Sequence, residues 1–426
     1  MKTHILIMAF FIFTTAWAQP PHTFTQTAHI NDGGIAVGLA VGLDGTVFLA
    51  NGSDGLRAYN YDGASFTSTA HIIVGSGWSY PEHLTLGLDG TVFVVHNPPL
   101  PPPGTENGLR AYTYDDTSFT NTAHIHDGRY ALDVAVGPDS TIFVAYSTDG
   151  LRAYTYHDTS FTNTAHIDSG SFAAQGVAVG PDGTIFVACG DEGLRAYSYD
   201  DTSFTNTTHI DDGGEALGVA IGPDGTVFLA NYDDGLRAYS YDDTSFTNTA
   251  HIDDGGHARR IAIGPDGTVF LANYDDGLRA YSYNGTSFTN TAFINNGDLA
   301  LDVAVDSDGT IFLANGDMGL YAYTYSGYTA IKNQSLKTPV GYSLHQNYPN
   351  PFNPTTTIEF ALPQTGFVSL KVYNILGEEV ATLVSEKLAA GNYKYDWDAS
   401  GLASGVYLYR LQAGDYVETR KMVLLR

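Results

Sequence analysis

One phrase of the sequence recurs seven times, and this repetition restricts the folds that the chain can adopt. Segments close to PDGTVFLAN each carry an aspartate, and the last four of these aspartates are spaced by 42 residues. Around each copy lie four short runs of alternating or β-branched residues, bounded by Gly, Pro, Asp or Ser, which is the pattern of strands and turns. None of the runs has the length or the 3.6-residue period of a helix. The seven aspartates are Asp44, Asp89, Asp139, Asp182, Asp224, Asp266 and Asp308.

The period and the phase of the repeat together predict a closed ring. Units of about 40 to 45 residues with four strands each are typical of a β-propeller. The array begins with the fourth-strand motif at residues 23–30 and ends with the third-strand motif at residues 319–325. Pairing these two segments would complete a sheet and remove two unpaired edges. We therefore predict an all-β chain with a seven-bladed β-propeller over residues 19–331, closed by its N-terminal strand. An open β-solenoid with two coils per unit is the alternative.

Two columns of polar residues recur with the repeat. In GLRAYSY the arginine and both tyrosines project from one side of the strand, as at Arg237, Tyr239 and Tyr241. We favour packing of guanidinium on ring between blades over a binding role for this column. Histidines recur in TAHI, but the ligands of one metal ion must converge to about 2.0 to 2.3 Å from it. Equivalent positions of different blades point apart, so we predict no shared metal at His29, His71, His124, His166, His209 and His251.

Charge is divided unevenly along the chain. Residues 19–331 contain nine arginines, no lysine and 38 acidic residues, whereas residues 332–426 contain nine basic and eight acidic residues. A body this acidic repels phosphate backbones, so we expect no nucleic-acid partner. Solubility outside the cell explains the charge better than cation storage does. The DSDG segment at residues 306–309 lacks the carboxylates of a calcium loop and is interpreted as a tight turn. We predict no metal and no cofactor.

The N-terminus has the features of an export signal. Residues 1–18 contain a basic residue, an apolar run from Ile5 to Phe13, and small residues before Gln19, which is the pattern of a secretory signal peptide. The apolar run is shorter than the roughly 18 to 20 residues that a membrane span needs, and we expect no span elsewhere. Cys189 is the only cysteine, so an extracellular fold depends here on burial and backbone pairing rather than on disulfides.

Differences between the repeats concentrate on one face of the predicted disc. The second unit carries two insertions, within residues 74–83 and 96–107, and both fall in loops of that face. The residue just before each first strand also varies. In a ring, this residue surrounds the mouth of the central channel, where charges focus a field. Drift at an unconstrained loop edge is the other interpretation. We predict that a small polar ligand or a peptide binds around Trp78, Tyr80, Glu82, His83, Asp133 and Arg260.

Evidence for catalysis in the sequence is thin. The sequence contains no nucleophile elbow, no histidine-rich zinc spacing and no phosphate loop. Aspartates are abundant in turns, and a carboxylate pair for glycoside hydrolysis depends on a geometry that sequence does not reveal. A fold alone does not fix an activity. We therefore favour a binding or surface-structural role over an enzyme.

The last part of the chain has the pattern of a separate domain. After a polar linker at residues 332–343, alternating runs such as VSLKVY and GVYLYRLQ predict a small antiparallel, Ig-like β-sandwich over residues 344–426. Four segments here closely resemble the type A C-terminal sorting domain of the type IX secretion system. The repeats themselves look broadly like NHL-type propellers, without a motif of a named activity. The four segments are NYPNPFNPTTTIEFALP, VYNILGEEVATL, ASGLASGVYLYRLQAG and the final TRKMVLLR.

The resemblance to the sorting domain implies a route and a location. Such a chain is expected to cross the inner membrane by its signal peptide, fold in the periplasm, and cross the outer membrane with the type IX secretion machinery as its partner. It is then held at the outer face of that membrane or released. Two functions remain open: a recognition module for an extracellular carbohydrate or protein, which we favour, and a polysaccharide hydrolase or lyase acting from the loop-rich face.

Overall fold

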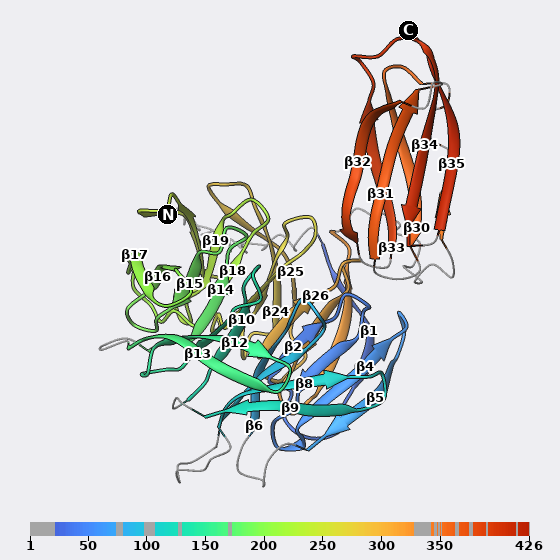
Figure 1. Cartoon of the computed structure of the whole chain (residues 1–426). Coiled ribbons are helices and arrows are strands. Elements are labelled where there is room, and N and C mark those ends of the chain that lie inside the picture. Colours follow the sequence, from blue (N-terminus) through green and yellow to red (C-terminus); the bar gives the residue numbers. More distant parts are fainter. Residues whose placement is uncertain are drawn as a thin grey trace, which may run out of the picture. The chain divides into compact units, whose positions relative to one another are not determined.

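The structure is a computed structural model whose regular elements are almost all strands (Figure 1). The chain separates into two compact units, one with the repeats and one with residues 330–426. Only the 3-10 turn η1 (Gly52–Asp54) is helical among the described residues, which confirms the all-β prediction, and nothing helical there has the length and hydropathy of a bilayer span. The predicted signal peptide (residues 1–18), most of the predicted linker and Trp78 lie outside the described residues. These are 22–73, 80–97, 107–126, 130–168, 173–327, 342–344, 347, 350, 352–362, 366–374, 378–388, 391–414 and 416–425.

Within residues 22–327, the strands form seven four-stranded sheets, here called repeat sheets and numbered by their first strand. Each first strand is an end strand of its sheet and contacts the first strands of both neighbouring sheets, so the contacts run round a cycle and return from the seventh first strand to the first one. This cycle is what a closed ring requires. The first strands are β2 (Gly38–Val41), β6 (Tyr80–Leu86), β10 (Asp133–Val136), β14 (Gly176–Val179), β18 (Gly218–Ile221), β22 (Arg260–Ile263) and β26 (Asp302–Val305).

The second strands are the most deeply buried part of each repeat sheet. Their uninterrupted apolar runs, such as VFLA, are buried at every position, because neighbouring sheets cover both faces of the strand. Burying such side chains stabilises the fold by roughly 1.5 to 3 kcal/mol each. The second strands are β3 (Val47–Ala50), β7 (Val92–Asn97), β11 (Ile142–Ala145), β15 (Ile185–Ala188), β19 (Val227–Ala230), β23 (Val269–Ala272) and β27 (Ile311–Ala314).

The third strands lie between the second and fourth strands, and a register shift after the alanine places two buried residues next to each other. In LRAYSY the leucine, alanine and first tyrosine are buried, and the serine is exposed. The third strands are β4 (Leu56–Tyr61), β8 (Gly108–Tyr114), β12 (Leu151–His157), β16 (Leu194–Tyr199), β20 (Leu236–Tyr241), β24 (Leu278–Tyr283) and β28 (Leu320–Tyr325).

The fourth strands are the outer edges of the repeat sheets and are largely polar, as edge strands exposed to water must be. In FTNTAHI only the phenylalanine and the alanine are buried. The fourth strands are β5 (Phe66–Ile72), β9 (Phe119–Ile125), β13 (Ser160–Ile167), β17 (Phe204–Ile210), β21 (Phe246–Ile252), β25 (Phe288–Ile294) and, from the start of the chain, β1 (Phe24–Ile30).

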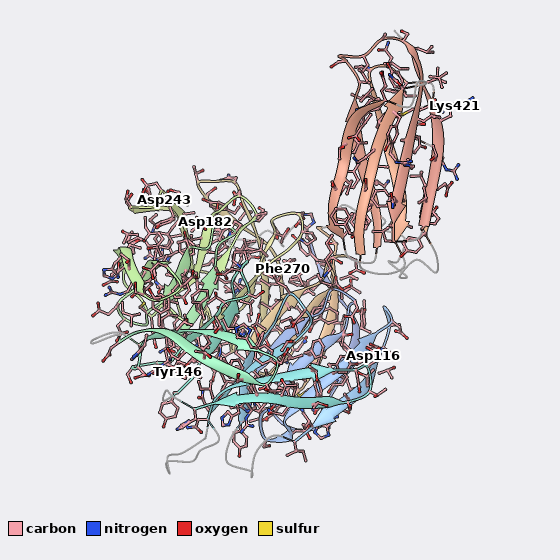
Figure 2. All side chains as sticks on the ribbon, viewed as in Figure 1. Asp116, Tyr146, Asp182, Asp243, Phe270 and Lys421 are labelled. Carbon is pink, nitrogen blue, oxygen red and sulfur yellow. The ribbon has the colours of Figure 1, made fainter. Side chains whose placement is uncertain are left out.

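The N-terminal strand completes the seventh repeat sheet. β1 pairs antiparallel with β28, with Phe24 opposite Tyr325 and Ile30 opposite Leu320, as the phase of the repeat predicted. Phe24 also packs against Phe270, which lies at the buried interior of the unit (Figure 2). The two ends of the repeat array are therefore tied together by a backbone ladder and by apolar contacts.

The contact between neighbouring repeat sheets, here called a seam, uses the same tyrosine each time. The last tyrosine of a third strand bonds a fourth-strand threonine of the preceding sheet, and its ring packs edge-on against a second-strand phenylalanine there. At the seam made by β1, Tyr61 bonds Thr27 at 2.5 Å, and its ring centroid lies 5.4 Å from that of Phe312. The pairs among the described residues are Tyr61–Thr27, Tyr114–Thr69, Tyr156–Thr122, Tyr199–Thr164, Tyr241–Thr207, Tyr283–Thr249 and Tyr325–Thr291.

The arginines of the third strands have a different role from the predicted one. Arg237 forms an ion pair of 2.6 Å with Asp234, three residues earlier in its own repeat, and Arg152 pairs with Asp149 at 2.9 Å. The cation–π contact of Arg279 is with Phe293 of its own sheet. The ring contacts of Arg279 with Phe293 and of Arg152 with Tyr146 thus lie within one repeat, and not between blades as expected. The tyrosines make the contacts across the seam, because the nearby aspartates pair with the arginines.

The repeated histidines and aspartates form hydrogen bonds with the backbone of nearby loops and turns. Each TAHI histidine donates from Nε2 to a backbone carbonyl of the loop before the third strand of its sheet, over 2.6 to 2.8 Å. In the turn between the first and second strands, the aspartate accepts from the amide two residues ahead, as Asp224 does from Thr226 at 3.0 Å. Such side-chain bonds fix tight turns. The DSDG segment bonds in the same way, from Thr310 to Asp308.

The C-terminal unit consists of two antiparallel sheets, as predicted for a sandwich. One has the order β29-β30-β33, and the other has the order β32-β31-β34-β35. Alternate residues from both sheets, such as Ile358, Leu370 and Tyr409, are fully buried in one core. The strands are β29 (Ser343–Leu344), β30 (Thr355–Leu362), β31 (Gly366–Asn374), β32 (Glu379–Leu388), β33 (Gly391–Asp398), β34 (Gly405–Ala413) and β35 (Tyr416–Leu424).

Candidate functional site

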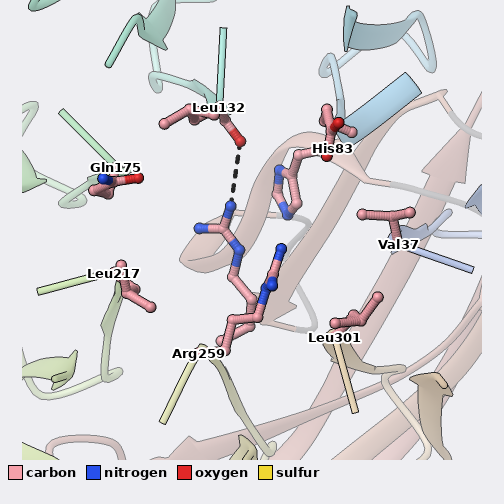
Figure 3. A pocket seen from close by; sticks show the side chains of 9 residues that line it. Val37, His83, Leu132, Gln175, Leu217, Arg259 and Leu301 are labelled. Atoms are coloured by element: carbon pink, nitrogen blue, oxygen red, sulfur yellow. Dashed lines mark hydrogen bonds between the residues drawn. The ribbon is translucent and has the colours of Figure 1, made fainter. Parts of the chain in front are cut away.

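Seven equivalent residues, one from each repeat, surround a hollow at the start of the first strands (Figure 3). The hollow has a volume of about 170 Å³. Backbone pairing fixes six of these residues, all except Glu82, because their amides bond the last carbonyl of the second strand, as Arg259 does with Ala272 at 3.0 Å and Leu217 with Ala230 at 2.9 Å. Glu82 lies at an irregularity in the pairing of β6 with β7. His83 and Arg260 also line the hollow. The seven residues, here called the mouth ring, are Val37, Glu82, Leu132, Gln175, Leu217, Arg259 and Leu301.

The residues that follow the mouth ring form a second set, here called the floor ring. Three members are glycines, and they allow the first strands to approach closely. A Cβ at Gly38 would lie 2.5 Å from the carbonyl oxygen of Glu82, and one at Gly218 would lie 2.4 Å from that of Arg259. The sequence placed the floor ring before the first strands, but most of its members are the first residues of those strands. The floor ring is Gly38, His83, Asp133, Gly176, Gly218, Arg260 and Asp302.

The four charged members of the floor ring pair with one another across the ring. Arg260 donates to Oδ2 of Asp133 at 2.9 Å, although 127 residues separate them in the chain. His83 lies between two carboxylates, 2.7 Å from Oδ1 of Asp133 and 3.4 Å from Oδ2 of Asp302. Arg260 also donates to the carbonyl of Leu132 at 3.3 Å. These ion pairs join the second, third, sixth and seventh repeat sheets and close the floor of the hollow.

Backbone amides of the next sheet hold both carboxylates in place. Asp133 accepts from the amide of Val177 at 2.9 Å, and Asp302 accepts from the amide of Leu39 at 2.8 Å. Both amides follow a floor-ring glycine, where the strands come close enough for this bond. Only 6% of each carboxylate side chain is exposed. The network is therefore rigid, and its acidic members are not available to a ligand.

The charges of this network are set by its ion pairs. Burial by itself raises the pKa of Asp133, but Arg260 and His83 outweigh burial and lower it to about 2. Burial likewise favours neutral His83, but Asp133 outweighs it and raises the pKa of His83 to about 9. At neutral pH His83 is consequently an imidazolium that stabilises the floor and is not free to act as a general base.

One carboxyl group does face the hollow. Burial raises the pKa of Glu82, and the positive charges of Arg259 and Arg260 partly offset that rise. Arg259 carries the charge opposite to that of Glu82. Burial lowers the pKa of Arg259, and repulsion from Arg260 lowers it further. The accessible lining thus combines one acidic and three basic groups with apolar residues. This is the composition of a site for a small polar ligand.

A second group of side chains lies on the same face, in loops next to the mouth ring. The ring of His257 stacks on that of Tyr232, with centroids 4.5 Å apart, and lies edge-on to Tyr274 at 6.0 Å. Tyr274 in turn lies 5.9 Å from the guanidinium carbon of Arg259. His257 pairs with two exposed carboxylates, Asp233 at 3.0 Å and Asp275 at 2.8 Å. We call Tyr232, His257 and Tyr274 the aromatic group.

The predicted site residues are placed unequally. Glu82, His83 and Arg260 line the hollow together, and Asp133 lies beneath them in the floor. Tyr80 pairs with Asn97 at the start of β6 and does not line the hollow, and Trp78 lies outside the described residues. Sequence reasoning missed Arg259 and Gln175 of the mouth ring and the whole aromatic group. A column-by-column comparison of the repeats would have found them, because each departs from the residue that other copies carry.

Metal chemistry has little support at this site. In the part of the chain that the structure describes, no group of three or more His, Cys, Asp or Glu side chains is arranged to hold an ion. The Nε2 atoms of the six TAHI histidines form hydrogen bonds with backbone carbonyls, as described above. The arrangement around the hollow can bind and orient a polar molecule through charge and hydrogen bonds.

Comparison with protein families identifies the C-terminal unit. Residues 346–425 match the family described as "Secretion system C-terminal sorting domain". This is the sorting domain of the type IX secretion system, in agreement with the resemblance noted in the sequence. The match indicates export by that system, to the cell surface or beyond. A search of curated proteins found no match.

Comparison with solved structures identifies the fold of the repeat unit. Virginiamycin B lyase from Staphylococcus aureus superposes with a TM-score of 0.57 at 12% identity, over 71% of this chain and 98% of that chain. A catalytically inactive variant of that lyase with quinupristin gives a TM-score of 0.59 at 12% identity, over 71% and 99%. The WD40 β-propeller domain of Doa1 gives 0.52 at 12% identity, over 71% and 97%. Identities this low show the fold alone, which is a β-propeller.

Proposed function

We propose that this protein is a secreted or cell-surface recognition module that binds an extracellular carbohydrate or protein at the mouth ring. The sorting domain supports export by the type IX secretion system. The floor ring favours the interpretation of the hollow as a binding pocket rather than as an open channel. Arg260, Asp133 and His83 form ion pairs across the ring beneath the hollow. A ligand therefore enters and leaves from one face.

The observation that carries this proposal is the variation of the mouth ring within nearly identical repeats. The seams are the same in every copy, whereas the mouth ring reads Val, Glu, Leu, Gln, Leu, Arg and Leu. Because one acidic, one basic and one amide side chain stand among four aliphatic ones around one hollow, the mouth ring makes a single asymmetric site. A repeat protein that bound one ligand per repeat would instead keep the binding residues identical in all copies.

The alternative function is that of an extracellular polysaccharide hydrolase or lyase. Glu82 favours it, because a carboxyl group with a raised pKa suits a general acid. Hydrolysis of a glycosidic bond, however, ordinarily uses two carboxyl groups flanking the bond. The other two nearby carboxylates, Asp133 and Asp302, are held in ion pairs and backbone bonds of the floor. We therefore place binding first.

We further infer the domain organisation in which this function resides. A signal peptide occupies residues 1–18, and a complete seven-bladed propeller closed by its N-terminal strand occupies residues 19–331. A linker at 332–343 joins the propeller to the sorting domain at 344–426, whose two sheets are Ig-like. The cyclic contacts of the first strands and the pairing of β1 with β28 support the propeller assignment.

The binding proposal is tested with the purified full chain on arrays of glycans and extracellular matrix proteins. Gln175→Trp fills the hollow from a mouth-ring position that takes part in no ion pair of the floor. Thr205→Trp, at an exposed position of the outer strand β17, is the matched control. We expect Gln175→Trp to remove the array signals of the wild-type chain and Thr205→Trp to keep them. Turnover of a bound polysaccharide by the wild-type chain would favour the alternative function.

The export proposal has a separate test. Removal of residues 344–426 should leave the repeat unit in the periplasm of a bacterium with a type IX secretion system, because the sorting signal is lost. The measurement is immunodetection in periplasmic, surface and medium fractions. The full chain is the control, and efficient display or release of the truncated chain would contradict the role of the tail.

A further inference from the structure

The sixth repeat departs from the fifth at one short segment. Residues 211–226 and 253–268 are identical except at four positions, where Glu-Ala-Leu-Gly-Val is replaced by His-Ala-Arg-Arg-Ile. The replacement adds three basic side chains, His257, Arg259 and Arg260, to a unit with an excess of acidic residues. Two of them line the hollow, and the third belongs to the aromatic group.

Arg259 differs from the arginines of the third strands in lacking a paired carboxylate. Arg237, for example, bonds Asp234 directly. The guanidinium of Arg259, by contrast, has no ion pair with any residue that the structure describes. It lies near the ring of Tyr274, is repelled by Arg260, and is attracted by the carboxyl groups of Glu82 and Asp302 only from beyond ion-pair distance. A half-buried guanidinium that has no carboxylate in direct contact is less well stabilised than one held in an ion pair. A ligand carboxylate in the hollow would supply that contact, in the bidentate geometry that arginine favours.

Tyr232 and Tyr274 occupy positions that suit glycine. Their φ angles are +44° and +47°, in the left-handed region that bulky residues rarely adopt. The equivalent residues of the first, fourth and seventh repeats are Gly52, Gly190 and Gly316, with φ between +54° and +57°. A tyrosine there carries backbone strain, and such strain gathers at functional sites. The gain is a partly exposed aromatic face next to Arg259.

We propose that the mouth ring binds the terminal hexuronate of an acidic glycan, with the carboxylate on Arg259 and the following sugar against Tyr274. This inference rests on the proposed binding function and names its ligand class. The closed floor admits the end of a chain rather than its middle. A sugar ring offers C–H faces to the tyrosines and hydroxyl groups to Glu82, Asp233 and Asp275, which are acceptors when ionised. The further carboxylates of an acidic peptide, by contrast, would be repelled by these ionised acceptors.

The test is a titration of the purified full chain, followed by saturation-transfer NMR and calorimetry, with four probes. These are glucuronate, galacturonate, glucose and acetate. We expect either hexuronate to bind at least about tenfold more tightly than glucose, because the charge-assisted bond is lost with glucose. We also expect acetate to bind at least about tenfold more weakly than the hexuronate, because it lacks the hydroxyl groups that would bond the carboxylates around the hollow.

Two variants separate the two contacts. Arg259→Gln should weaken hexuronate binding by about tenfold or more and leave glucose unaffected. Tyr274→Gly should weaken binding of a hexuronate disaccharide by several-fold while keeping the fold, because glycine is the residue of three other repeats at this position. Arg195→Gln, which removes the same charge from a third strand with a 3.6 Å pair to Glu192, is the control and should bind as the wild type does.

Any one of the following results would overturn the inference: equal affinity for glucose and hexuronates, equal affinity for acetate and hexuronates, or unchanged binding by Arg259→Gln. Absence of any hexuronate binding would overturn it as well. The binding proposal itself fails separately. If another array ligand binds the wild type and is lost in Gln175→Trp, the recognition function holds and only the hexuronate assignment is wrong.

Discussion

The seams between repeat sheets and the mouth ring both take one set of residues from each repeat. The seam residues are the same in every repeat, whereas the mouth-ring residues differ between repeats. At every seam a tyrosine bonds a threonine and packs edge-on against a phenylalanine, as Tyr283 does with Thr249 and Phe228. At the mouth ring no such rule holds, and Glu82, Gln175 and Arg259 stand where other copies have Val or Leu. The comparison teaches that the repeat is retained where packing depends on it and departs where the side chain faces the hollow.

The physical reason for the difference is the environment of each position. A seam phenylalanine is surrounded by fixed neighbours, so a change in its volume leaves a cavity or a clash. A mouth-ring side chain is attached through backbone bonds that do not depend on its identity, such as that of Gln175 with Ala188 at 2.8 Å. The mouth ring can therefore change chemistry without loss of fold.

The largest expected effect breaks a seam. Phe312→Ala at the seam made by β1 should lower the free energy of unfolding by about 3 to 5 kcal/mol, because Phe312 is fully buried and its removal leaves a cavity. Phe228→Ala, at the equivalent position of another seam, should cost about the same. Chemical denaturation of the full chain measures both. A loss at Phe312 smaller by several kcal/mol than that at Phe228 would show that the seam made by the N-terminal strand is not equivalent to the others.

The next effect concerns the floor ring and appears as a pH dependence. The pKa of His83 is raised from 6.5 to about 9, so the stability that its ion pairs contribute is complete below pH 6.5 and is lost as the pH rises through 9. The loss for the wild type is expected to reach up to about 3 kcal/mol. His83→Gln should be less stable at low pH and should show a flatter profile between about pH 6.5 and 9.

The contribution of Asp133 to stability changes with pH in the opposite direction, at acid pH. Its pKa is lowered from 3.8 to about 2, so its contribution is complete above 3.8 and is lost as the pH falls through 2. Denaturation midpoints of wild type and His83→Gln across both ranges make the measurement. Parallel profiles of the two proteins at alkaline pH would contradict the assignment of His83 to the floor network.

Much of this fold could be predicted from the sequence, because repetition supplies long-range information that a single copy lacks. The period fixed the four strands of a unit, and the phase of residues 23–30 against 319–325 predicted the pairing of β1 with β28. The arginine column was misjudged for a local reason. The aspartate three residues before each arginine, such as Asp234 before Arg237, was available as a partner and was overlooked.

The site was only half predictable, because its contacts cross the ring. Equivalence of positions brought Glu82, His83, Asp133 and Arg260 to one mouth, but the direct pairing of Arg260 with Asp133 depends on the width of the ring and the reach of one side chain. The aromatic group was missed because Tyr232 and Tyr274 lie in loops that resemble ordinary turns. Comparison with the glycines that the first, fourth and seventh repeats carry at this position would have marked them, and their positive φ angles confirm that they are exceptional.

A smaller effect sharpens the account of the seams. Tyr241→Phe keeps the ring packed against Phe186 and removes only the hydroxyl bond to Thr207, which is 2.9 Å long. We expect a loss of about 1 kcal/mol in the free energy of unfolding, the usual worth of one such bond. Tyr241→Ala is the comparison variant and should cost several times more, because the ring is lost as well. Equal losses in the two variants would mean that the hydroxyl bond, rather than the ring, holds the seam.

The smallest expected effect tests whether a departure from the repeat outside the mouth ring has any role in binding. Ser140 stands in a turn between first and second strands, where Gly183, Gly225 and other copies have glycine, and its φ is +70°. No atom lies within 4 Å of a Cβ built at Gly183, so the backbone angle alone decides the cost of a side chain here. Ser140→Gly should therefore raise the free energy of unfolding by about 0.5 kcal/mol, since relief of left-handed strain slightly exceeds the entropy cost of glycine. The reciprocal Gly183→Ser should lower it by a similar amount, both measured by denaturation. Ligand binding should be unchanged in both, because this turn joins strands at the end away from the mouth ring. A change in binding would show that departures from the repeat carry function beyond the mouth.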